Sequence, residues 1–527
     1  MMTKQFPANK VALLSLILFL FSLTSRAQRD GDLDSAFNAN TALFTADFGG
    51  QDNLNDVKIQ ADGKIVATGV ALTPAFTGEL KVIRLNDDGT PDNNFGTNGI
   101  FTFSQTNEAY GIQSYIRTDG KIVVAGLASL VMGYYDFLVL RLNDNGTIDS
   151  TFGTNGYTVV SFANFDDLTQ AMTVQDDGKI IVSGTITDSV NYFNNPAIIR
   201  FTEDGFLDSA FGTNGVLFIP GVDIDNELTG LKIQPDGKIL ASGHWQNVNM
   251  GFSDYDVMIV RAKQDGTLDS TFGINGIVRT SVNGGVDDCF GIDQDVNGNI
   301  FVAGFTTLPT TLTLDMILLK YDSTGTPDPT FGTNGLVTYN DTSYDVGNDV
   351  KCLPDGNIIV GGASGLDWLD PRPFTLWRYL PDGSLDTTFG VNGVSNIYFS
   401  QGPNEINSIA LQSDYKVVAA GKIFGGVNND VGIARFMNSS GNNSIHEATN
   451  ASEVFIYPNP VTSRSIISGL TSGDRLELYD LSGRLIQSMK PASSSFTFEK
   501  GSLSSGTYIL KIVSTSGTFK TGKLIIG

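Results

Sequence analysis

Short apolar runs separated by turns rich in glycine, aspartate and asparagine fill most of the chain. Residues 122–124 and 138–140 are typical, because each is a continuous apolar run and not an alternation of apolar and polar residues. Such runs favour β-strands that are covered on both faces. The segment 118–120 places Asp-Gly between two strand-like runs, which is a strong hairpin signal. No convincing helical periodicity appears after residue 27, so the pattern predicts an all-β protein.

A single motif, Gly-x-x-Asp-x-x-Phe, occurs seven times at intervals of about 59 residues. Its aromatic residues are Phe37, Phe95, Phe152, Phe211, Phe272, Phe331 and Phe389. A basic residue of a later strand repeats with the same period, as Arg84, Arg141, Arg200, Arg261, Lys320, Arg378 and Arg435. Repeats of this length indicate solenoids, propellers or arrays, and four short antiparallel strands per repeat indicate a propeller blade. We therefore predict a seven-bladed β-propeller of four-stranded blades over residues 28–440.

The two ends of the predicted propeller have complementary patterns. Residues 40–48 follow the first motif just as outer strands follow the other motifs, whereas 430–436 form a third strand with no outer partner after it. We expect these two segments to pair and to complete the seventh blade. Pairing of this kind closes the ring and leaves no free sheet edge at the seam.

Two strings carry a family resemblance. Leu-Asp-Ser-Thr-Phe-Gly at 268–273 and Gln-Pro-Asp-Gly-Lys-Ile-Leu at 234–240 recur in variant form in the other repeats. They resemble the delta-60 repeats of bacterial surface and secreted proteins, which are themselves similar to NHL-type propellers. The resemblance covers 31–441 and implies a propeller fold, but it implies little about a ligand.

The N-terminus has the features of a secretory signal peptide. Lys4 and Lys10 precede an uncharged run at 11–23, and small residues at Ser25 and Ala27 provide a cleavage site before residue 28. We predict a signal peptide at 1–27, since the run is too short to span a membrane. No later stretch approaches the length of a membrane span, so we expect no transmembrane segment in the mature chain.

The end of the chain forms a module of its own. Residues 441–452 are small and polar and are predicted to be a linker. The following segment, 453–527, contains strand-like runs around a Pro-Asn-Pro turn and a Leu-Ser-Gly hairpin. We predict a small Ig-like β-sandwich here.

Four landmarks of this module resemble the type A C-terminal sorting domain of the type IX secretion system of Bacteroidota. They contain Tyr457, Pro458, Asn459, Pro460, Gly483, Gly506 and Tyr508, and the closing run 523–526 completes them. The resemblance implies the type IX secretion machinery as a partner. It also implies a destination at the outer-membrane surface or in the extracellular medium. An ordinary accessory sandwich is the alternative.

Composition excludes several classes of function. The net charge of −23 argues against nucleic acid as a partner, because phosphate binding needs the opposite sign. The two cysteines, Cys289 and Cys352, fall out of register on equivalent strands and are predicted to be buried and unpaired. The two histidines, His244 and His446, leave little material for a His-dependent catalytic site. We found no motif for a nucleophile, a phosphate-binding loop or a cofactor, and predict no catalytic residue and no cofactor.

Two sets of acidic residues could suggest a metal, but a structural role explains both better. The string of Asp293, Asp295 and Asn297 resembles an EF-hand loop, yet its twelfth position is Gly304 and it falls on a repeated hairpin. The repeated motif contributes Asp34, Asp92, Asp149, Asp208, Asp269, Asp328 and Asp386. Because they recur in every blade, eight residues after the basic residue, we expect structural salt bridges or turn caps. We predict no metal site.

The likeness to NHL propellers implies the strand order 111–117, 121–127, 137–142 and then an outer strand after the next motif. The repeated turns then share one face, and the loops of variable length share the other. These variable loops carry the aromatic residues and the histidine that we propose as ligand-binding candidates: Tyr134, Tyr135, Tyr192, Phe193, His244, Trp245, Tyr255 and Trp368. Aromatic faces beside polar groups suit sugars or peptides.

These observations favour a non-enzymatic, exported scaffold that binds glycan or protein. The alternative is a polysaccharide lyase or hydrolase that uses carboxylates or tyrosine in the propeller funnel.

Overall fold

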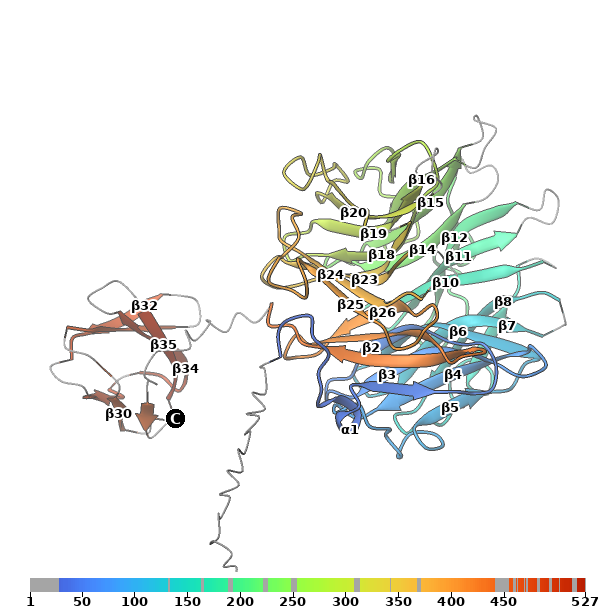
Figure 1. Cartoon of the computed structure of the whole chain (residues 1–527). Coiled ribbons are helices and arrows are strands. Elements are labelled where there is room, and N and C mark those ends of the chain that lie inside the picture. The colour runs from blue at the N-terminus through green and yellow to red at the C-terminus, as the bar shows by residue number, and fades with distance from the viewer. Residues whose placement is uncertain are drawn as a thin grey trace, which may run out of the picture. The chain divides into compact units, whose positions relative to one another are not determined.

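Figure 1 shows a computed structural model of the chain, which describes residues 28–440 and 455–526 with short gaps. The gaps are 131–132, 163–164, 188–192, 221–225, 248–253, 308–312, 342, 367–370, 458–460, 462, 469, 471–472, 481–483, 492–494, 502 and 514–518. The predicted signal peptide, 1–27, and the predicted linker, 441–452, lie outside the described residues. The chain forms two compact units, divided between Ser439 and Ser440. Within the described ranges, no helix has both the length and the apolar character that a membrane span requires.

The first unit is built from four-stranded antiparallel sheets. The first sheet contains β2 (Asp52–Ile59), β3 (Ile65–Leu72), β4 (Gly78–Leu85) and β5 (Ile100–Phe103). The second contains β6 (Glu108–Ile116), β7 (Ile122–Ser129), β8 (Asp136–Leu142) and β9 (Tyr157–Val160). The third contains β10 (Asp167–Val174), β11 (Ile180–Thr187), β12 (Asn194–Phe201) and β13 (Val216–Phe218). The fourth sheet contains β14 (Glu227–Ile233), β15 (Ile239–Asn247), β16 (Asp254–Ala262) and β17 (Ile277–Thr280). The fifth contains β18 (Asp287–Gln294), β19 (Ile300–Thr307), β20 (Leu314–Tyr321) and β21 (Leu336–Tyr339). The sixth contains β22 (Tyr344–Cys352), β23 (Ile358–Gly365), β24 (Phe374–Tyr379) and β25 (Val394–Ile397). A single parallel bridge between Leu314 and Tyr344 links the last two sheets.

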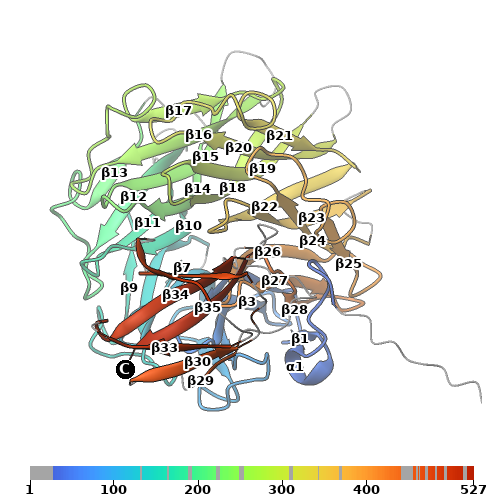
Figure 2. The ribbon, with the colours of Figure 1, turned by 90° about the vertical axis from the view of Figure 1, so that its left-hand side faces the viewer.

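The seventh sheet joins the two ends of the propeller. It contains β26 (Glu405–Leu411), β27 (Val417–Phe424), β28 (Asn429–Phe436) and, as its outer strand, β1 (Leu43–Ala46), which follows the single turn α1 (Phe37–Asn40). β1 pairs antiparallel with β28, so that Phe44 faces Ile433. The predicted ring closure is therefore confirmed. Figure 2 shows the sheets arranged around a central axis, and the first strand of each sheet lines that axis.

Each innermost strand contains a β-bulge at the same position. In β2, for example, the register against β3 shifts between Leu54 and Asp56. The strand opposite carries Gly69, where a Cβ atom would lie 2.0 Å from the backbone oxygen of Asn53, so that only glycine fits. The same glycine recurs as Gly126, Gly184, Gly243, Gly304, Gly362 and Gly421. The bulge residues are Asn55, Ile112, Gln170, Thr229, Phe290, Asn348 and Asn407.

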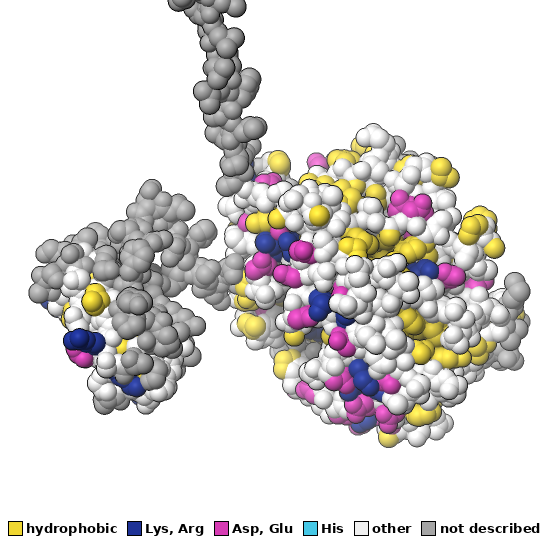
Figure 3. Space-filling model, turned by 90° about the horizontal axis from the view of Figure 1, so that it is seen from below, with side chains coloured by type: hydrophobic (Ala, Val, Ile, Leu, Met, Phe, Trp, Pro, Cys, Tyr) yellow, Lys and Arg dark blue, Asp and Glu magenta, His cyan; other side chains and the backbone are white. Residues whose placement is uncertain are grey.

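The repeated motif forms one compact unit in every blade. Arg261 Nε donates to Asp269 Oδ2 at 2.9 Å, and its guanidinium lies 4.5 Å from the ring centre of Phe272. Arg261 Nη1 also donates to the backbone oxygen of Ser323 in the next blade, at 2.5 Å. Equivalent pairs occur in all seven sheets, so the predicted structural role of the repeated aspartates is confirmed. Charged side chains of opposite sign also lie side by side on the surface in Figure 3.

The cores lie between neighbouring sheets. Leu80 and Val82 of one sheet pack with Ile122 and Val124 of the next, together with the buried motif residue Phe95. The strands are thus covered on both faces, as their continuous apolar runs predicted, and the all-β propeller fold is confirmed.

The second unit contains two sheets. They are β29 (Phe455–Tyr457), β30 (Arg464–Ser468) and β33 (Ser495–Glu499), and β32 (Leu485–Met489), β31 (Arg475–Tyr479), β34 (Gly506–Val513) and β35 (Phe519–Ile526). Its described core includes Leu476, Leu510 and Leu524. The strands β30 and β33 were not expected from the sequence: β30 does not alternate between apolar and polar residues, whereas β33 alternates strictly but only over five residues.

Two predictions about single residues have clear outcomes. Cys289 and Cys352 are both free thiols, as expected, but only Cys289 is buried; the prediction that Cys352 is buried is wrong, since Cys352, at the end of β22, is only partly buried at the edge of a core. The calcium-like string forms a hairpin turn, in which Asp295 Oδ1 accepts hydrogen bonds from the backbone nitrogens of Asn297 and Asn299, both at 2.9 Å. The interpretation of this string as a turn is confirmed.

Candidate functional site on the loop face and in the central pocket

The two faces of the propeller differ in character. We call turn face the side that carries the tight turns from first to second and from third to outer strands. We call loop face the opposite side, where the second strand connects to the third and the outer strand to the next blade. Both names refer to the first unit alone.

Exposed aromatic side chains gather on the loop face. Among the described residues of the propeller, those that are more than a third exposed are Phe76, Tyr134, Phe193, Phe218, Tyr398 and Phe206. All but Phe206 lie on the loop face, because they follow a second strand or an outer strand. Single exposed aromatic side chains scattered over a whole protein surface are common. Exposed aromatic side chains that gather on one face instead indicate an interaction surface.

Three of the predicted candidates lie together in one blade. β15 carries His244 and Trp245, and β16 carries Tyr255. His244 and Tyr255 meet edge to face with ring centres 4.8 Å apart, and His244 Nδ1 lies 3.0 Å from Asp288 Oδ1. The guanidinium of Arg279 lies 4.5 Å from the ring centre of Trp245. These side chains are half-buried, so the cluster offers ring edges and polar groups to the loop face.

The other predicted candidates lie in neighbouring blades. Tyr134 packs edge to face on Phe165, and Tyr135 donates a hydrogen bond from its hydroxyl to Glu108 Oε2 at 2.8 Å. Burial and the hydroxyl of Tyr110 beside it raise the pKa of Tyr135 well above its usual value, so its phenol stays neutral. Phe193 is exposed at the start of the third strand of the next blade. Tyr192 and Trp368 lie outside the described residues.

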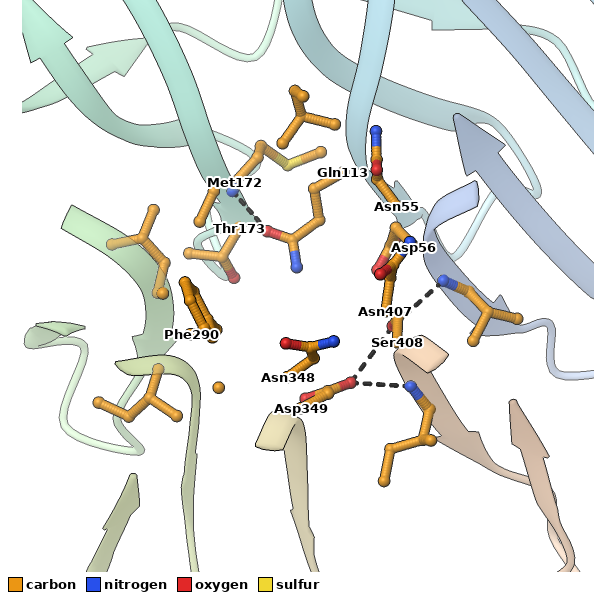
Figure 4. Close-up of a pocket in the computed structure, with 18 of the residues that line it drawn as sticks. Asn55, Asp56, Gln113, Met172, Thr173, Phe290, Asn348, Asp349, Asn407 and Ser408 are labelled. Atoms are coloured by element: carbon orange, nitrogen blue, oxygen red, sulfur yellow. Dashed lines mark hydrogen bonds between the residues drawn. The ribbon is translucent and has the colours of Figure 1, made fainter. Parts of the chain in front are cut away.

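A pocket of about 620 Å³ lies on the propeller axis, and all seven innermost strands line it. Figure 4 shows the amide groups of Gln113 and Asn348 extending into this space and the ring of Phe290 on its wall. Gln113 Oε1 accepts a hydrogen bond from the backbone nitrogen of Met172 at 2.6 Å. The other lining residues named in Figure 4 are Asn55, Asp56, Thr173, Asp349, Asn407 and Ser408.

The bulge side chains tie neighbouring blades together around this pocket. Asn55 Nδ2 donates to the backbone oxygen of Gly111 at 2.8 Å, and Asn407 Nδ2 does the same to Leu54 at 2.7 Å. Asn348 Nδ2 reaches Ile406 in the same way, at 2.8 Å. In each case the acceptor directly precedes the bulge of the next blade. The wall is therefore held rigid by its own polar side chains, as a preformed site requires.

Three lysines of the pocket are paired with aspartates. Lys232 Nζ lies 2.6 Å from Asp293 Oδ1, and Lys351 Nζ lies 2.6 Å from Asp349 Oδ1. Lys58 pairs with Asp56 in the same way. With Glu227, four acidic residues and three lysines line the pocket, so their charges nearly balance and suit a neutral polar ligand better than an ion.

The sequence did not identify the pocket residues, although one signal was present. Each bulge faces a glycine that follows a small or apolar residue in the second strand, as in Val-Ala-Gly at 124–126. The residue paired with that glycine is followed directly by the bulge residue, and the bulge residue lines the pocket, so the glycine marks the position one residue before the lining position. The motif residues of the predicted sorting module are only partly described: Gly506 and Tyr508 lie on β34 and Tyr457 ends β29, whereas Pro458, Asn459, Pro460 and Gly483 lie outside the described residues.

Comparison with known families identifies both units. The β-propeller domain of unknown function DUF5122 matches 60–95, 117–152, 175–211, 234–272 and 353–389. The secretion system C-terminal sorting domain matches 455–527. No curated protein matches the chain.

Solved structures of similar architecture have low sequence identity. PorZ of Porphyromonas gingivalis, a surface component of its type IX secretion system, is 13% identical with a TM-score of 0.37; the match covers 92% of this chain and 60% of PorZ. A PL25 ulvan lyase is 10% identical with a TM-score of 0.41, covering 75% and 97%. The propeller domain of the Trilobed protease of Pyrococcus furiosus is 11% identical with a TM-score of 0.38, covering 75% and 98%.

Proposed function

Because the chain carries DUF5122 β-propeller repeats and a type IX secretion sorting domain, it is a secreted or cell-surface protein, and we propose that its propeller binds a glycan through the loop face. The observation that carries the proposal is the concentration of exposed aromatic side chains on that face. Sugars stack on aromatic rings while their hydroxyl groups bind nearby polar groups. The half-buried cluster of His244, Trp245 and Tyr255 and the amides of the central pocket provide such groups.

The spacing of the exposed rings favours a glycan over a protein. Phe76, Tyr134, Phe193 and Tyr398 belong to four different blades, and Phe218 belongs to the same blade as Phe193, so the exposed rings are spread over four blades and do not form one contiguous apolar core. Protein interfaces instead have a continuous buried centre surrounded by polar residues. A rigid scaffold that presents separated rings is suited to a polymer with repeated units.

A glycan array with the exported propeller tests the proposal. We expect Phe193→Ala to weaken binding of the selected glycan about 10-fold, because one stacking contact is lost. Phe206→Ala is the matched control, since Phe206 belongs to the same blade and is similarly exposed but lies on the turn face. Equal affinity of both variants, or capture of a protein in place of any glycan, would contradict the proposal.

The catalytic alternative has one observation in its favour. His244, Asp288 and Tyr255 form a histidine–carboxylate–phenol group next to Glu227, which lines the pocket and faces His244 across β14 and β15. Such groups can move a proton during cleavage of a polysaccharide. If the bound glycan is shortened over time, and His244→Ala stops the shortening, the protein is an enzyme.

A further inference from the structure

Four interfaces between neighbouring blades carry the same pair of aspartates on the loop face. One aspartate lies among the first three residues of the third strand of a blade, and the other lies among the first two residues of the innermost strand of the next blade. The pairs are Asp136 with Asp167, Asp256 with Asp287, Asp315 with Asp345, and Asp430 with Asp52. The last pair lies at the seam where β1 closes the ring.

In two of the three interfaces away from the seam, a partner of opposite character contacts each aspartate of the pair. Arg279 Nη2 lies 2.8 Å from Asp256 Oδ2, and the hydroxyl of Thr306 donates to Asp287. In the next interface Asn340 Nδ2 donates to Asp315 at 3.0 Å, and the hydroxyl of Ser364 donates to Asp345. In these two interfaces the protein itself thus provides a cation or a hydrogen-bond donor to each aspartate, although Asp256 Oδ1 and Asp315 Oδ1 have no hydrogen-bond partner among the described residues.

The seam lacks these partners and adds a third acid. Residue Ala71 faces Asp52, in the place where Thr306 faces Asp287. Asp47, from the loop between β1 and β2, brings a carboxylate oxygen to within 4.8 Å of oxygens of Asp52 and Asp430. Among the described residues, none of these three forms an ion pair; the nearby Lys81 binds Glu79 and Thr102 instead.

Asp52 has an oxygen that no described group satisfies. The residue is 1% exposed, and its Oδ2 accepts a hydrogen bond from the backbone nitrogen of Phe48 at 2.7 Å, whereas its buried Oδ1 has no hydrogen-bond partner among the described residues. Burial, with the charges of Asp47 and Asp430, raises the pKa of Asp52 to about 6. A buried carboxylate oxygen left without a donor among two further carboxylates is costly unless a cation completes the group.

We propose that Asp47, Asp52 and Asp430 bind a Ca²⁺ ion that fastens the seam of the propeller. The three oxygens lie within the span of opposite ligands on Ca²⁺, whose bonds are about 2.4 Å long. All ligands are hard oxygens, and the exposure of Asp47 leaves room for the waters that complete the coordination. The ion joins the N-terminal segment, the first innermost strand and the closing blade, so it stabilises the closed ring.

Calcium titration of the mature protein by calorimetry and thermal unfolding tests the proposal. We expect one bound Ca²⁺ with a Kd of about 10⁻⁴–10⁻³ M, as in other extracellular sites, and a rise in Tm of about 1–2 °C at a tenfold excess over Kd. Asp430→Asn should abolish both effects. In EGTA the Tm of Asp430→Asn should equal or exceed that of the unchanged protein, because the substitution removes one of three carboxylates that repel one another.

Asp315→Asn is the matched control, since it changes the equivalent position in an interface with only two acids. It should bind Ca²⁺ like the unchanged protein. The proposal is overturned if calcium gives no binding heat, or if Asp430→Asn binds it as before. A variant that melts lower in EGTA than the unchanged protein would show that Asp430 has a structural role of another kind.

Discussion

The surroundings of individual aspartates in this propeller shift their pKa values in opposite directions. Lys320 and the hydroxyl of Thr330 hold the pKa of Asp328 at about 2, and Asp269 beside Arg261 also has a pKa of about 2. Burial, with the charges of Asp256 and Asp254, instead raises the pKa of Asp287 to about 6. The first kind of residue stabilises the fold when ionised, and the second kind when protonated.

A pH dependence of stability follows from Asp287. Its folded pKa lies above its unfolded value, so its contribution is fully present below about pH 4 and is lost as the pH rises through 6. The contributions of Asp269 and Asp328, whose pKa values are depressed, are lost only as the pH falls below about 4. We therefore expect the Tm in EGTA to rise when the pH is lowered from 7 to 5.

Asp287→Asn should reduce that rise, because asparagine is neutral throughout and still accepts the hydrogen bond from the backbone nitrogen of Val282. Thermal unfolding of both proteins between pH 5 and pH 7.5 measures the difference. Parallel pH profiles would show that Asp287 is ionised over the whole range.

The strands illustrate what periodicity in a sequence can and cannot give. Glycine, aspartate and phenylalanine of the motif repeat because each blade needs the same turn and the same buried ring, so blades and their order could be predicted. The bulge has no residue type of its own: Asn55, Ile112 and Phe290 occupy equivalent positions. The calcium ligands come from three segments that only ring closure brings together, so no spacing in the sequence marks them.

The outer strand contributed by the N-terminus should be essential for stability. Phe37 is fully buried and Phe44 is 8% exposed, so removing 28–48 deletes two core aromatics and opens the seam. Loss of one large core aromatic costs about 3–5 kcal/mol, and we expect the truncated propeller to lose at least this much. Urea denaturation measures the effect, with a protein lacking 441–527 as the control. An unchanged midpoint would mean that β1 contributes nothing to the closed ring.

The two compact units divide the work of the whole molecule. The sorting domain accounts for the destination of the protein. The propeller forms a compact unit with its own core and its own hydrogen bonds, and this unit ends at Ser439. Independent units of this kind tolerate removal of one another.

Deletion of 453–527 should leave the Tm of the propeller unchanged but keep the protein from the cell surface, trapped in the periplasm. Cell fractionation together with thermal unfolding of the purified propeller checks both parts. Truncated protein at the surface would show that another segment directs export.

The pairing of β1 with β28 also has a consequence for the timing of folding. Leu43 pairs with Ala434, about 390 residues later in the chain. The first strand to be synthesised therefore waits for the last before it finds its partner, and contacts across so long a separation form slowly. Six blades can assemble from local hairpins while synthesis continues, but the circle stays open until its final strand emerges. Until then the exposed edges of its first and last sheets need protection from other chains.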